Sequence, residues 1–127
     1  MGEPQRLKSR KQIDILFEKG KKITQFPFRI LYLTEPGKVE VKAGFTVSSK
    51  NFPRAVDRNR IKRLSRESYR IQKKELEASI RENRSALILF FIYTGREIIS
   101  YTEVSNAIKQ ALDKLIRAIH ADHSQNT

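Results

Sequence analysis

The sequence predicts an α+β fold in which helices pack against one small sheet. Residues 28–47 alternate their side chains with the period of two that is typical of strands, and residues 85–95 form a continuous apolar run. The segments before, between and after them repeat apolar residues at helical spacing. A chain of 127 residues buries one core but not two. We therefore expect a single domain over residues 1–127, folded from about 6 to 119 and followed by a polar tail at 120–127.

The first expected element is a short helix that begins near Ser9, a residue type that caps helices. Ile13, Leu16 and Phe17 follow at the i, i+3, i+4 spacing of one apolar face. Gly20 is placed to end this helix, because glycine readily adopts the left-handed conformation found just past helix ends.

Two strands are expected next. Phe28, Ile30 and Tyr32 alternate with their neighbours, and residues 39–47 repeat the pattern with five side chains on one face. The sequence "EPGK" at 35–38 between them is typical of a turn. Together these features predict a β-hairpin, whose long second strand is either whole or split in two.

The second half of the chain predicts a helix, a strand and a helix. The second helix begins at Pro53 or Asp57 and runs to about Ile80. The apolar run at 85–95 is expected to be a buried central strand. Ser100 and Glu103 have the spacing of a capping box at the start of the last helix. Its expected buried stripe consists of Val104, Ala107, Ile108, Ala111, Leu112, Leu115 and Ile119.

Composition limits the classes of function that we expect for this chain. Lysine and arginine total 26 against 14 acidic residues, which gives a formal charge of +12. Such an excess attracts nucleic acid or an anionic membrane surface. Cysteine is absent, which excludes disulfides, thiolate metal sites and cysteine nucleophiles. No apolar run approaches the roughly 20 residues of a membrane span. We expect a soluble, cytoplasmic protein that does not bind a membrane.

The segment "RNRIKRLSRESYR" at 58–70 concentrates the charge. On a helix, Ile61, Leu64, Ser68 and Ile71 share an inner face, while the cations recur along another side. Asp57 and Glu67 are the only acidic residues between Lys50 and Lys74. The alternative is an ordinary solvated face, but such faces usually mix charge signs because i, i+4 pairs are stabilising. Forked arginine side chains suit bidentate phosphate contacts, so the pattern favours binding of a phosphate backbone.

No catalytic or metal-binding constellation accompanies this helix. The sequence contains no phosphate-binding glycine motif and no HExxH pattern. No histidine lies in the part expected to fold, so a serine nucleophile would lack its base. We expect a protein that binds no metal by itself and is not a self-sufficient catalyst.

The strand "GFTVSSK" at 44–50 followed by "AVDRNRIKRLSRESYR" at 55–70 closely resembles the signature of the protein subunit of bacterial ribonuclease P. The first helix is also similar, at Phe17 and Gly20, and the resemblance covers roughly residues 6 to 117. It implies a small mixed sheet packed with helices in the order α-β-β-(β)-α-β-α, with a left-handed βαβ crossover, which departs from the usual right-handed rule.

The resemblance also implies a function. Ribonuclease P removes the 5′ leader of precursor tRNA, and its large RNA subunit is the catalyst, using Mg²⁺ held mainly by RNA and substrate. The small protein binds that RNA and the leader. The expected partners are therefore the catalytic RNA and precursor tRNA.

The expected site has two parts. A single-stranded leader is best held by cations together with flat side chains on which bases stack. The leader candidates are Ile13, Phe17, Tyr32 and Phe45, for which core packing is the alternative. The expected RNA-binding residues are Lys50, Arg54, Arg58, Asn59, Arg60, Lys62, Arg63, Arg66 and Arg70.

A generic basic RNA-binding or ribosomal protein fits the composition equally well, and only the ordered motif argues against it. A DNA-binding regulator would need side chains that read bases, whereas an arginine run favours backbone contact.

Overall fold

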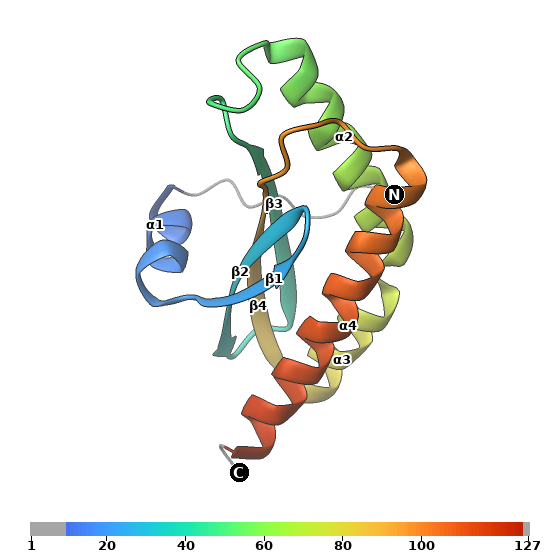
Figure 1. The fold of residues 1–127 in the computed structure, drawn as a ribbon. Helices are drawn as coiled ribbons and strands as arrows, with labels where there is room; N and C mark the ends of the chain where they lie inside the picture. The colour runs from blue at the N-terminus through green and yellow to red at the C-terminus, as the bar shows by residue number, and fades with distance from the viewer. Residues whose placement is uncertain (1–9, 126–127) are drawn as a thin grey trace.

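The computed structural model describes residues 10–125 and confirms the α+β class (Figure 1). The elements are α1 (Arg10–Lys19), β1 (Lys21–Gln25), β2 (Phe28–Pro36), β3 (Glu40–Val47), α2 (Ala55–Gln72), α3 (Lys74–Asn83), β4 (Ser85–Tyr93) and α4 (Tyr101–Gln125). No helix within the described residues is long and apolar enough to cross a membrane.

The strands form one four-stranded mixed sheet in the order β1-β2-β4-β3. β1 pairs antiparallel with β2, and β2 pairs antiparallel with β4. β3 runs parallel to β4, so the chain between them, which contains α2 and α3, makes the crossover of a βαβ unit. This arrangement confirms the small mixed sheet that the resemblance implied.

The predicted hairpin over residues 28–47 is wrong. β2 and β3 follow one another in the chain, but β4 lies between them and pairs with both. The reason is burial, because β4 carries apolar side chains on both faces and is most stable in the interior of the sheet. The turn at 35–38 indicates only a change of direction, and it does not show which strand becomes the neighbour.

The third strand of the N-terminal half does not come from splitting residues 39–47. It is β1, a short edge strand joined to β2 by the turn at Phe26 and Pro27. Polar residues dominate it, with Ile23 its apolar member, so it lacks the apolar alternation that marks a half-buried strand.

The sheet has two unequal faces (Figure 1). One face packs against α2, α3 and α4 and holds the main core, which includes Phe28, Ile30, Tyr32 and Phe91. The other face, with Leu31, Ile88 and Phe90, packs against α1. Alternate residues of β2 and β4 therefore point into different cores.

The two terminal helices follow their predictions closely. α1 ends at Lys19, as predicted, but Gly20 is not in the left-handed conformation. A glycine is required there because a Cβ would lie 2.4 Å from the carbonyl oxygen of Leu16. Ser9 lies outside the described residues. The Ser100 cap of α4 is confirmed, since Ser100 Oγ accepts a hydrogen bond from the backbone N–H of Glu103 at 3.2 Å. Every member of the predicted α4 stripe is buried, although the helix continues to Gln125, past its expected end at about Ile119.

The second helix differs from its prediction in two ways. It is broken at Lys73 into α2 and α3 instead of running unbroken to Ile80. Its buried residues are Ile61, Ser65, Ser68 and Tyr69, whereas Ile71 is 57% exposed. Small serines occupy the inner face because α2 lies close to α4, where Gln72 Nε2 donates to the Ser105 carbonyl oxygen at 3.1 Å.

Three connections meet at one end of the sheet. The backbone N–H of Thr94 donates to the Pro27 carbonyl oxygen at 2.7 Å, which joins the β4–α4 connection to the β1–β2 turn. Asn51 Nδ2 donates to the carbonyl oxygens of Thr94 and Gly95, each at 3.5 Å, which adds the β3–α2 connection. A Cβ on Gly95 would lie 3.1 Å from Pro27 Cβ, so glycine permits this close contact.

Candidate RNA interface

Aromatic contacts anchor α2 to the sheet through Tyr69. Its ring lies 5.7 Å from that of Phe45 on β3 and 5.6 Å from that of Phe91 on β4. Burial raises the pKa of the Tyr69 hydroxyl, with a smaller contribution from the negative charge of Glu77. Because this inner face is fixed, the outer side chains of α2 project from a rigid support.

The outer side of α2 carries the predicted cations. Arg54, Asn59, Arg60 and Arg63 are exposed, and Lys62 and Arg66 are half-buried beside the inner face. Within residues 10–121, whose side chains the structure describes, five of these cations form no ion pair with an acidic side chain. We call these five the α2 cation row, namely Arg54, Arg60, Lys62, Arg63 and Arg66. Their positive charge is available to a partner.

Two predicted RNA-binding residues already have partners in the protein. Arg70 forms a hydrogen-bonded ion pair with Glu67 one turn earlier, and the hydrogen bond lowers the pKa of Glu67. Arg58 Nη1 donates to the carbonyl oxygens of Phe52 and Pro53, each at 2.8 Å. Arg58 therefore holds the β3–α2 connection against the first turn of α2, a role that its place in the motif did not indicate. Lys50 is exposed on that connection.

The leader candidates divide between the two faces of the sheet. Tyr32 is 4% exposed in the main core, and the Phe45 ring stacks on Phe91 at 5.0 Å. Both rings make core contacts on the face of the sheet that packs against α2, α3 and α4. Phe17 is 60% exposed on α1, on the opposite side of the sheet, where Ile13 is half-buried.

Phe17 has a neighbour that sequence reasoning missed. Its ring meets Phe90 of β4 edge to face, with centroids 6.1 Å apart. Beside Phe90, β3 contributes Gly44 and, on the same face, Lys42 and Thr46, both half-buried. Phe90 was missed because the apolar run at 85–95 predicts a strand buried on both faces. Such a pattern does not show which part of a sheet face α1 leaves uncovered. This surface combines an exposed aromatic ring with a lysine on the neighbouring strand, whose Nζ lies 3.9 Å from Glu40 Oε1 in a long ion pair.

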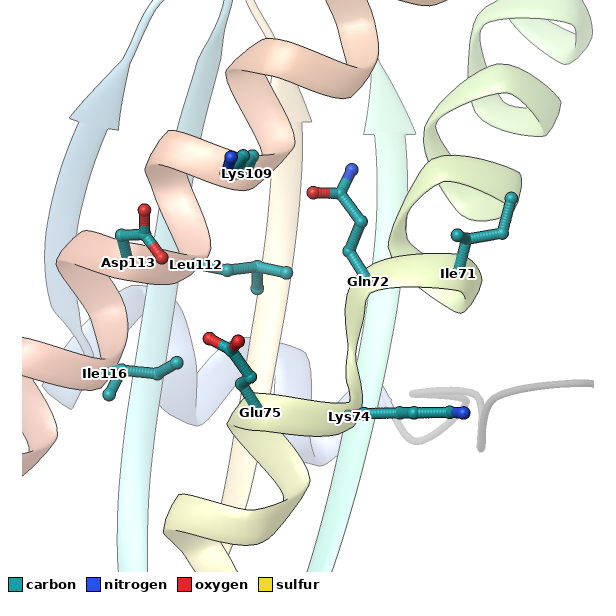
Figure 2. Close-up of a pocket in the computed structure, with 8 residues that line it drawn as sticks. All are labelled: Ile71, Gln72, Lys74, Glu75, Lys109, Leu112, Asp113 and Ile116. Carbon is teal, nitrogen blue, oxygen red and sulfur yellow. The ribbon is translucent and has the colours of Figure 1, made fainter.

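A separate pocket of about 260 Å³ lies between α4 and the junction of α2 with α3 (Figure 2). Its walls include both signs of charge, Lys74 and Lys109 on one hand and Glu75 and Asp113 on the other. It therefore lacks the charge bias of the α2 cation row. Among residues 10–125 no group of three or more histidine or acidic side chains could hold a metal ion.

Comparison with known families identifies the family of the chain that carries this motif. A family model described as Ribonuclease P matches residues 1–116. The chain belongs to the ribonuclease P protein family. A ribonuclease P protein component from Porphyromonas gingivalis is 31% identical over 117 residues, covering 91% of this chain and 85% of the relative. Another from Escherichia coli O157:H7 is 37% identical over 76 residues, covering 60% of this chain and 55% of the relative.

Solved structures of the ribonuclease P family share the fold. The protein from Staphylococcus aureus superposes with a TM-score of 0.66 at 19% identity, covering 89% of this chain and 96% of that one. The protein from Thermotoga maritima gives a TM-score of 0.67 at 21% identity, covering 87% and 96%. The four-stranded sheet with its helices is thus the architecture of this ribonuclease P family.

Proposed function

We propose that the chain is the protein subunit of a ribonuclease P ribonucleoprotein, which removes the 5′ leader of precursor tRNA. In this proposal α2 binds the catalytic RNA, and the surface around Phe17 binds the leader. The observation that carries the proposal is the α2 cation row, because these cations lack acidic partners within residues 10–121 and lie in a chain of the ribonuclease P family.

The cation row is suited to the phosphates of folded RNA. Arginine presents a planar fork of donors that fits two phosphate oxygens, and the helix fixes the spacing between successive forks. Contacts of this kind position a nucleic acid without reading its sequence. The protein therefore recognises the shape and charge of the catalytic RNA.

The leader needs different chemistry because it is single-stranded. Its bases are free to stack on an aromatic ring, while its phosphates need a nearby cation. Phe17 offers the ring and Lys42 the cation, on the face of the sheet that carries α1, although a phosphate must compete with Glu40, whose Oε1 lies 3.9 Å from Lys42 Nζ. Tyr32 and Phe45 are given no part in the leader contact, since their rings are used by the core.

In this scheme the RNA subunit performs the cleavage, and the protein increases affinity for substrates that carry a leader. Magnesium ions belong to the RNA partners, whose phosphate oxygens are the hard ligands that Mg²⁺ prefers. The protein assists by reducing repulsion between the two RNAs, because its positive charge lies between their backbones.

The test is reconstitution with an in vitro transcribed bacterial ribonuclease P RNA. The protein alone should leave precursor tRNA intact, and its addition to the RNA should restore leader removal at low Mg²⁺. A double variant, Arg60→Gln with Arg63→Gln, should restore less, whereas Lys109→Gln with Arg117→Gln on α4 removes the same charge elsewhere and should act like the wild type. Cleavage by RNA-free protein, or preferential binding of ribosomal RNA, would contradict the proposal.

A further inference from the structure

Phe26 is 73% exposed, more than any other large apolar side chain among residues 10–121. It lies in the turn between β1 and β2, at the end of the sheet where three connections meet. A single exposed apolar residue is common on protein surfaces and by itself indicates nothing. Phe26 differs from such a residue in two ways: its backbone is held in place on both sides, and cations lie at the same end of the sheet.

The turn that carries Phe26 is held on both sides. Before it, Gln25 pairs with Phe28 in the sheet, and its side-chain Nε2 donates to Gln110 Oε1 of α4 at 3.0 Å. After it, Pro27 is buried, and its carbonyl oxygen accepts hydrogen bonds from the backbone N–H and the hydroxyl of Thr94 at 2.7 and 3.1 Å. The ring of Phe26 is therefore presented to solvent from a fixed backbone, and little conformational freedom is lost when a ligand binds it.

Cations come to the same end from the other two connections. Lys50 precedes Asn51, whose side chain bonds the carbonyl oxygens of Thr94 and Gly95, and Arg96 follows Gly95. Both Lys50 and Arg96 are exposed, and neither forms an ion pair within the described part of the chain. Glu97 is the acidic residue next to them, so the local balance remains positive. We call Phe26, Lys50 and Arg96 the sheet-end surface.

Lys50 of this surface is linked along the chain to the α2 cation row. The connection that carries Lys50 leads directly to Arg54, and Arg58 fixes that connection to α2 through Phe52 and Pro53. A polyanion that follows the row toward the start of α2 therefore reaches Lys50 and then Phe26. Phe17 lies on α1, against Phe90 on the face of the sheet opposite α2.

We infer that the sheet-end surface binds an unpaired nucleotide of the catalytic RNA, whose base stacks on the Phe26 ring while Lys50 and Arg96 contact the flanking phosphates. The inference rests on the proposed function for the identity of the RNA. An unpaired nucleotide is required because a base inside a duplex presents no free face to a side chain. Stacking accepts any base, so the contact adds affinity more than sequence preference.

The experiment measures equilibrium binding of the full chain to an in vitro transcribed bacterial ribonuclease P RNA. Phe26→Ala should weaken binding by about fivefold to a hundredfold, the usual loss for one base–aromatic stack. Phe26→Trp should bind like the wild type, and Phe26→Leu should bind like Phe26→Ala because it keeps an apolar group without a ring face. Ile71→Ala, which truncates an exposed apolar side chain on the pocket side of α2, should have no effect.

Salt dependence separates stacking from charge. Phe26→Ala should leave the log–log slope of affinity against salt unchanged, whereas Lys50→Gln and Arg96→Gln should each reduce it by up to about 0.7 to 0.9. The melting temperature should be the same for every Phe26 variant, since the ring is exposed.

Three results would overturn the inference. The first is equal binding by the Ala, Leu and Trp variants at Phe26. The second is a loss confined to leader-bearing precursor tRNA with normal binding of the catalytic RNA, which would assign the ring to the leader. The third is normal binding by Phe26→Ala while Arg63→Gln binds weakly, which would leave the proposed function intact. If the wild type binds no ribonuclease P RNA, the proposed function itself fails and the inference fails with it.

Discussion

Phe17 of α1 and Phe90 of β4 meet edge to face at 6.1 Å and 75°, and Phe17 nevertheless remains 60% exposed. The two rings are close to perpendicular, so one presents its edge to the other, and more than half of the Phe17 side chain stays open to a ligand. Such an arrangement differs from a core pair, in which both rings are buried.

The first prediction concerns this pair. Phe17→Ala should weaken binding of leader-bearing precursor tRNA to the holoenzyme by about fivefold to a hundredfold, because one base loses its stacking surface. Binding of mature tRNA and assembly with the catalytic RNA should not change. The measurement is the ratio of the two tRNA affinities, and Ile15→Ala on the same helix is the control, since Ile15 is also exposed. A large fall in melting temperature with an unchanged ratio would remove Phe17 from the leader site.

The second prediction concerns the α2 cation row. Arg63→Gln should reduce affinity for the catalytic RNA and flatten its salt dependence by up to about 0.7 to 0.9 in log–log slope. The reason is that binding releases fewer counterions when a phosphate contact is lost. Arg117→Gln removes an exposed arginine from α4 and should leave the slope unchanged. A fall in affinity at constant slope would point to base reading or to a folding defect.

The third prediction separates Arg58 from the rest of the motif. Arg58→Ala should lower the free energy of unfolding by about 1.5 to 3 kcal/mol, because two hydrogen bonds from a charged group to loop carbonyls, one partly buried and one exposed, are lost. Arg63→Ala should change it by less than about 0.5 kcal/mol, as is usual for exposed residues. Urea unfolding of both variants gives the comparison. Equal stabilities would mean that the Arg58 contacts contribute nothing to the fold.

The arginine motif illustrates how far the sequence predicts the site. Its position on a helix follows from spacing, and the structure places it on α2. The lack of acidic partners holds for the α2 cation row but not for Arg70, which pairs with Glu67. The role of Arg58 could not be predicted, because it depends on where the carbonyl oxygens of Phe52 and Pro53 lie in a loop. Spacing along a helix identifies a face and gives no information on loop atoms.

The sheet illustrates the same limit at the level of the fold. Periodicity predicted β2, β3 and β4 as strands, since each carries its own pattern of apolar residues. It did not predict that β4 separates β2 from β3, because strand order is decided by contacts between distant segments. It missed β1, whose apolar residue Ile23 packs against the main core but gives no alternating pattern by itself. Placing Tyr32 and Phe45 on the face that packs against α2, α3 and α4 likewise required knowledge of which face each helix covers.

The last prediction uses the buried Tyr69. Burial raises the pKa of its hydroxyl in the folded protein above the ordinary value of about 10 that it has in the unfolded chain. Below pH 10 the side chain is neutral in both states, so its full contribution to stability is present. As the pH rises above 10, the unfolded chain loses this proton and the folded protein keeps it, so the unfolded state is favoured. The free energy of unfolding of the wild type should therefore fall with pH relative to Tyr69→Phe, by up to about 1.4 kcal/mol per pH unit.

Urea unfolding of the wild type and Tyr69→Phe between about pH 8 and 11.5 measures this difference. The lysines are common to both proteins, so their deprotonation cancels when the two curves are subtracted. Tyr93, whose pKa burial also raises, cancels in the same way. A constant difference across this range would show that Tyr69 ionises as easily in the folded protein as in the unfolded chain. Its ring would then have access to water between α2 and the sheet, and the rigid support assumed for the α2 cation row would be lost.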